Sequence, residues 1–193
     1  MKQKRENLPG KAKVKGTMLQ AHIEWAEKKR PGCRQQVADR VSEESKGYAS
    51  GSLLVTDWIP FKALIDIDRA IAEALGGLPD DTYRALGHNS ASANLAGVYK
   101  SFVADEPHRF FDRGARLHDR FQDFGKAEYQ VLGDRSGRMR ITGYSEYSPV
   151  YCASAIGYYK GCLETMKVPG PIRVLETECQ CQGDAACVFD LNW

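Results

Sequence analysis

The chain has 193 residues, of which 42% are hydrophobic and 27% charged, as expected for a single globular domain with an apolar core. The formal net charge of +2 is too small to attract nucleic acid, so direct nucleic-acid binding is not expected. Neither an apolar run of about 18 residues nor a signal-peptide pattern is present, which predicts a cytoplasmic protein without a membrane span. In that compartment we interpret the six cysteines as thiols or metal ligands.

The first residues carry a local excess of lysine and arginine. We predict that residues 1–15 form a basic flexible tail and that residues 16–193 form a single domain. Within that domain, residues 16–122 are expected to be helical and residues 123–193 to contain the strands.

Apolar residues recur at helical spacing through the first two thirds of the chain. This spacing predicts helices over residues 17–29, 34–46, 61–75, about 80–103, and a fifth from Glu106 onward. Most aromatic residues of this part are expected in the core, with some lining a pocket: Trp58, Phe61, Tyr99, Phe102, Phe110 and Phe111. His22 shares a helix face with Met18 and Trp25, which favours a packed core histidine over a ligand.

The apolar period then changes from helical to alternating. Strands are predicted over residues 126–132, 138–144, 172–179 and 187–193, with a helix over 149–166 between the two pairs. The order is therefore β-β-α-β-β after a helical half. This order predicts an α+β fold, in which an N-terminal helical layer packs on a small antiparallel sheet of about four strands.

Three of the cysteines gather in the last hairpin, around the Gly183-Asp184 turn. Cys179 and Cys187 flank that turn at similar distances, so the hairpin can place them side by side. Cys152, in the first turn of the preceding helix, is a natural third metal ligand. Glu176 and Cys181 both remain candidates for the fourth, because Glu176 faces away from Cys179 on a regular strand and needs a bulge or a strand end between them. Buried free thiols are the alternative.

The C-terminal part resembles the 4-vinyl-reductase-type ligand-binding domain, which also forms the sensor of phenol-responsive transcriptional activators. The resemblance covers roughly residues 114–193. It rests on these segments: Gly114-Ala115-Arg116-Leu117-His118, Gly143-Tyr144-Ser145-Glu146, Pro149-Val150-Tyr151-Cys152, Glu176-Thr177-Glu178-Cys179, Gly183-Asp184 and Cys187-Val188-Phe189. The N-terminal half is similar in outline to stand-alone bacterial proteins of the same superfamily, through Val14-Lys15-Gly16-Thr17 and Trp58-Ile59-Pro60-Phe61.

The resemblance implies a structural zinc held by Cys152, Glu176, Cys179 and Cys187, which favours Glu176 over Cys181. It also implies that His118 and Tyr144 bind the ligand. Tyrosine replaces a tryptophan of the phenol sensors at position 144, which leaves the ligand's identity open. The superfamily includes haem nitric-oxide-binding domains, but Tyr147-Ser148-Pro149 is not their Tyr-x-Ser-x-Arg clamp and no proximal histidine can be assigned.

These observations together predict a non-enzymatic sensor or regulatory domain that binds a small apolar or aromatic ligand between helices and sheet. No nucleophile elbow, phosphate-binding loop or dinucleotide fingerprint is present. The resemblance implies a homodimer, and a separate output protein is expected because no output domain is recognised. Two alternatives are an assembly module of the same fold without ligand, and a thiol redox or metal-handling protein.

Overall fold

The structure is a computed structural model that describes residues 4–50, 53–54, 56–96 and 106–193. Its elements, in chain order, are β1 (Lys13–Lys15), α1 (Gly16–Lys29), α2 (Cys33–Ala38), α3 (Glu43–Ser50), β2 (Trp58–Pro60), α4 (Phe61–Leu75), α5 (Pro79–Ala96), α6 (Pro107–Arg116), η2 (His118–Arg120), β3 (Lys126–Gly133), β4 (Ser136–Thr142), α7 (Pro149–Thr165), β5 (Arg173–Glu178), η3 (Gln180–Gln182) and β6 (Ala186–Asn192).

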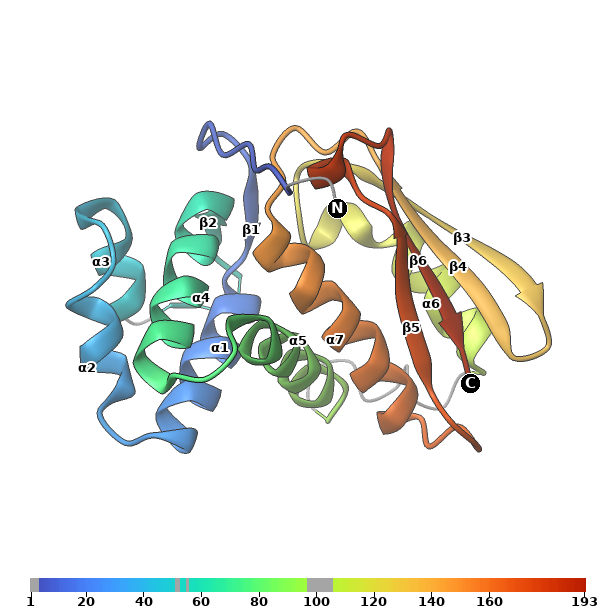
Figure 1. Ribbon diagram of the computed structural model, residues 1–193, viewed down its shortest axis with the longest axis horizontal. Coiled ribbons are helices and arrows are strands. Elements are labelled where there is room, and N and C mark those ends of the chain that lie inside the picture. Colours follow the sequence, from blue (N-terminus) through green and yellow to red (C-terminus); the bar gives the residue numbers. More distant parts are fainter. Residues whose placement is uncertain (1–3, 51–52, 55, 97–105) are drawn as a thin grey trace.

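The molecule has a helical layer and a four-stranded sheet, with α7 lying between α5 and the strands (Figure 1). The sheet has the order β3-β4-β6-β5, and each neighbouring pair is antiparallel. On β4, Met139 and Ile141 are buried beneath the helices, while the residues between them are partly exposed. The predicted α+β architecture is therefore confirmed. No helix in the described ranges is long and apolar enough to cross a membrane.

Local signals explain why most helices begin and end where they do. Glu106 caps α6 by accepting hydrogen bonds from the backbone N–H groups of His108 and Arg109, and Pro107 occupies the first turn. Gly76, at φ 76°, lies in the left-handed region and ends α4 after its buried apolar stripe. Both boundaries were predicted from the sequence.

The predicted helix over 34–46 is instead two helices, α2 and α3. The break has a tertiary cause, because the backbone N–H and the hydroxyl of Ser42 both donate to the carboxylate of Asp66 on α4. The predicted helix over about 80–103 is described as far as Ala96. Tyr99 and Phe102, which were expected in the core, lie outside the described residues.

The flexible tail predicted for residues 1–15 differs from the structure, which describes this segment from Lys4 onward. Val14 is fully buried, and β1 pairs with β2 in an antiparallel ladder. The buried carboxylate of Glu146 accepts hydrogen bonds from the backbone N–H groups of Lys11 and Ala12. Burial of Val14 and pairing of the backbone fix this segment, so residues 12–15 belong to the folded domain.

Helices α5 and α7 are in backbone contact through glycines. A Cβ on Gly157 would lie 1.9 Å from the carbonyl oxygen of Arg84, and a Cβ on Gly87 would lie 1.9 Å from that of Ser154. Only glycine permits so close an approach of two helix backbones. The contact therefore holds the sheet-side helix α7 against the helical layer.

We expect Gly157→Ala to lower the free energy of unfolding by about 1–3 kcal/mol or more, because the methyl group must displace the backbone of α5. Chemical denaturation of the purified protein measures this loss. Gly47→Ala in α3 is the matched control, since a Cβ there meets nothing within 4 Å, and it should be neutral or stabilising. Equal effects of the two substitutions would contradict the proposed contact.

Candidate functional site

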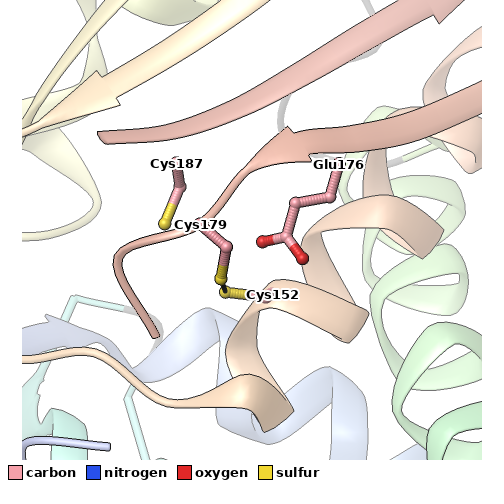
Figure 2. Close-up of side chains that lie close together, drawn as sticks. All are labelled: Cys152, Glu176, Cys179 and Cys187. Atoms are coloured by element: carbon pink, nitrogen blue, oxygen red, sulfur yellow. Dashed lines mark hydrogen bonds between the residues drawn. The ribbon is translucent and has the colours of Figure 1, made fainter. Parts of the chain in front are cut away.

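The C-terminal hairpin and α7 bring four potential metal ligands together. Figure 2 shows the side chains of Cys152, Glu176, Cys179 and Cys187 converging from α7, from β5 and the residue after it, and from β6. One ligand atom from each lies within 4.8 Å of all the others. The thiols of Cys152 and Cys179 are 3.6 Å apart, and all three cysteines of the group are buried.

A β-bulge explains how Glu176 reaches the same side as Cys179. Glu176 pairs with Phe189 of β6 and Glu178 pairs with Val188, so a step of two residues along β5 corresponds to a step of one residue along β6. The extra residue, Thr177, reverses the alternation of side chains. The sequence left a bulge or a strand end as the two ways in which Glu176 could join Cys179, and the structure has a bulge. The thiol of Cys181 lies 4.0 Å from that of Cys152 but is not among the four converging residues.

Four neighbouring thiols cannot all ionise easily, because each thiolate repels the next. Hydrogen bonds from Cys152, Cys181 and Cys187 lower the pKa of the Cys179 thiol. The interaction with Cys179 correspondingly raises the pKa of Cys152 well above its usual value. Burial, and then the neighbouring Cys179, raise the pKa of Glu176, whose other carboxylate oxygen accepts a hydrogen bond from Lys4 at 3.1 Å. A positive charge at the centre of the group would relieve this repulsion.

A cavity of about 170 Å³ lies between the helices and the sheet. Its walls come from α1, α5, α6 and α7 on one side and from β3 and β4 on the other. Phe110, Phe111, Met139 and Ile141 contribute apolar surface. Concave, mostly apolar cavities with a few polar groups are the usual form of small-molecule sites.

The two predicted ligand-binding residues, His118 and Tyr144, both line this cavity, with ring centroids 6.5 Å apart. Gln122 joins them: its side-chain amide nitrogen lies 3.1 Å from His118 Nδ1 and 2.5 Å from His118 Nε2, and it donates to the Tyr144 hydroxyl at 3.3 Å. The Tyr151 hydroxyl donates to the Gln122 carbonyl oxygen at 2.6 Å. His118 Nε2 donates to the backbone carbonyl of Phe124 at 3.1 Å.

This network assigns a hydrogen-bonding role to each group. Tyr144 accepts from Gln122, and no described residue accepts the hydrogen of the Tyr144 hydroxyl, so that hydrogen can be donated to a ligand. Burial raises the pKa of Tyr144 well above its usual value, which keeps this hydroxyl protonated. Both nitrogens of His118 are occupied within the protein, so His118 orients Gln122 in this structure.

The sequence did not identify Gln122 and Tyr151 as members of this network. Gln122 follows His118 by four residues and Tyr151 immediately precedes Cys152, so both are close in sequence to predicted site residues.

Gly125 packs against the ring of Tyr144. Its φ is 77°, and a Cβ at this position would lie 2.6 Å from the tyrosine ring.

No family model matches the sequence, and no curated protein matches it. Solved structures do match. One, from work on haem distortion in the H-NOX family, has a TM-score of 0.70 at 13% identity, over 93% of this chain and 95% of that chain. An oxygen-binding H-NOX domain related to soluble guanylate cyclases gives 0.69 at 13% identity, over 93% and 94%. An unliganded Fe(II) H-NOX protein from K. algicida gives 0.69 at 11% identity, over 93% and 96%.

The chain has the H-NOX fold. At these identities the likeness concerns the fold alone. The matched structures are H-NOX domains and do not support the 4-vinyl-reductase type named from the sequence.

The prediction of structural zinc as the cofactor is wrong by this comparison. The group named for the matched structures is haem, in work on haem distortion and on haem redox potential. The cysteine-rich cluster is nevertheless present in this chain. Its four residues are not among those that line the cavity.

The pKa of His118 predicts a pH dependence of stability. Burial lowers this pKa in the folded protein, and the hydrogen bond to Phe124 only partly opposes the shift. The unfolded chain, with a histidine pKa of about 6.5, therefore binds a proton that the folded protein does not. The contribution of His118 to stability should be fully present above about pH 6.5 and decrease as the pH falls toward the lowered pKa. Denaturation at pH 7.5 and 5.5 of the wild type and His118→Gln measures it. A wild-type advantage that stays constant or grows at the lower pH would contradict the assignment.

Proposed function

We propose that the protein is a non-enzymatic sensor domain that binds a small aromatic molecule in the cavity beside Tyr144. The observation that carries the proposal is an apolar cavity of about 170 Å³ lined by the Tyr144 hydroxyl, whose hydrogen has no acceptor among the described residues. A phenolic or carbonyl oxygen on the ligand would accept that hydrogen. The assignment of His118 and Tyr144 to a phenol-type ligand also rests on the resemblance of residues 114–193 to phenol sensors.

The size of the cavity sets the size of the ligand. An engineered protein cavity of roughly 150 Å³ holds benzene, so a cavity of about 170 Å³ suits a molecule with one ring. The phenylalanine side chains of α6 offer ring contacts, and Met139 and Ile141 of β4 close the opposite wall. Such contacts bind the apolar body of a ligand, while Tyr144 fixes its orientation.

Haem is the group named for the matched structures, and the residues of this cavity do not fit it. A haem macrocycle joins four pyrrole rings and is far larger than the one-ring space available. His118 cannot offer a free nitrogen to iron, because both of its ring nitrogens are hydrogen-bonded within the protein. The volume of the cavity therefore favours a one-ring ligand.

We propose further that Cys152, Glu176, Cys179 and Cys187 bind a metal ion. Thiolates favour soft or borderline transition metals, and a positive ion would offset the mutual repulsion of these groups. Four protein ligands close a site and leave no position for a catalytic water. Bound metal would join the β5–β6 hairpin to the first turn of α7, and its binding free energy would add to folding stability.

As a sensor, the protein would pass ligand occupancy to a separate output protein, and a homodimer is the proposed assembly. Both follow from the resemblance to dimeric sensors.

Binding of phenol tests the ligand proposal. Phenol should raise the melting temperature of the purified protein, because it binds the folded state only. Tyr144→Phe should weaken phenol binding roughly 5- to 10-fold, the loss of one hydrogen bond, and should leave the binding of toluene unchanged. Tyr48→Phe in α3, away from the cavity, is the control. The proposal fails if phenol does not stabilise the wild type, or if the protein takes up haem with a Soret band.

Elemental analysis tests the metal proposal. The purified wild type should contain about one metal ion per chain, and Cys187→Ser should lose it and unfold at lower denaturant concentration. Cys33→Ala is the control, because Cys33 is a buried cysteine of α2 outside the cluster. Metal-free wild-type protein with readily titrated thiols would refute this site.

A further inference from the structure

We infer that the cavity has a second polar end, formed by His22 and Ser90, and that it selects a ring carrying a hydrogen-bond donor there. This inference rests on the proposed function and deepens it, because it specifies the chemical class of the ligand. Such a ligand has an acceptor for the Tyr144 hydroxyl and, elsewhere on the ring, a donor for His22.

His22 is buried but is not a simple packing residue. Its side chain is 1% exposed, and its Nδ1 lies 2.6 Å from a carboxylate oxygen of Asp68 on α4, itself fully buried. A carboxylate can only accept, so Nδ1 carries the hydrogen. In the neutral imidazole the other nitrogen, Nε2, is then an acceptor. Nε2 is buried and has no partner.

We infer the side on which Nε2 lies from the residues around it. His22 lines the cavity and Asp68, which is bonded to Nδ1, does not, which places the opposite edge of the ring toward the cavity. Ser90 of α5 lines the same cavity, is 2% exposed, and its hydroxyl also has no partner. A buried polar group without a partner costs about 1–3 kcal/mol, so two such groups on one cavity wall favour a ligand that satisfies them.

The hydrogen bond to Asp68 determines which kind of group His22 Nε2 can bind. A carboxylate that holds one nitrogen of a histidine fixes the ring and makes the other nitrogen a better acceptor. Metal ligands are often held in this way. Among the described residues, however, His22 and Asp68 are not part of any group of three or more His, Cys, Asp or Glu side chains that could hold a metal ion. A ligand O–H or N–H is therefore the favoured partner.

Calorimetric titration of the full chain with phenol, resorcinol and hydroquinone tests the inference. The wild type should bind at least one of the two diols roughly 5- to 10-fold more tightly than phenol, the effect of one added hydrogen bond. In His22→Asn, the asparagine amide nitrogen takes the place of Nδ1 and keeps the bond to Asp68, but the Nε2 acceptor is lost. This variant should bind phenol as the wild type does and lose the preference for the diol.

Ser90→Ala provides an independent variant if His22→Asn does not fold, and it should reduce the same preference. Equal affinities of the wild type for phenol and both diols would overturn the inference. This is the result expected if a water molecule, and not the ligand, satisfies His22. A diol preference that survives in both variants would overturn it too. In either case phenol binding would leave the proposed function standing, whereas failure of all three probes to bind would overturn both.

Discussion

The backbone contact between α5 and α7 fixes the position of everything that surrounds the cavity. Gly87 and Gly157 allow the two helices to approach until a side chain no longer fits between them. Helix α7 is thereby held between the helical layer and the sheet (Figure 1). Its first turn supplies Tyr151 to the hydrogen-bond network of the cavity and Cys152 to the metal-ligand cluster. One helix thus sets the geometry of both candidate sites.

Elements with local signals were predictable from the sequence, and elements that depend on distant contacts were not. Pro149 after a capping Ser148 marks the start of α7, and Gly76 marks the end of α4. The break between α2 and α3 has a local signal in Ser42 before Glu43 and Glu44, but the contact that fixes it is with Asp66, 24 residues beyond Ser42. Strands β1 and β2 have three residues each, too few for alternation to be recognised.

The candidate sites divide in the same way. Spacing alone suggested Cys152, Cys179 and Cys187, and the family resemblance selected Glu176, but the bulge at Thr177 that allows it is a property of the paired strands. The cofactor named from that resemblance was wrong because the likeness of the whole fold is to haem proteins. His22 and Asp68 lie 46 residues apart on apolar helix faces, where a histidine is expected to be only a core residue. Their pairing is visible only in three dimensions.

The walls of the cavity differ in what holds them. On the α7 side, the glycine contact with α5 and the contact of the Cys152 thiol with that of Cys179 join α7 to its two neighbours. On the opposite side, the side chains of His118 and Gln122 bond to each other, to Tyr144 and Tyr151, and to the carbonyl of Phe124, and the backbone of Gln122 pairs with Val14 of β1. A ligand that takes the hydrogen of Tyr144 alters the network on this second side directly. The segment from α6 through η2 joins this network to β3, at the edge of the sheet.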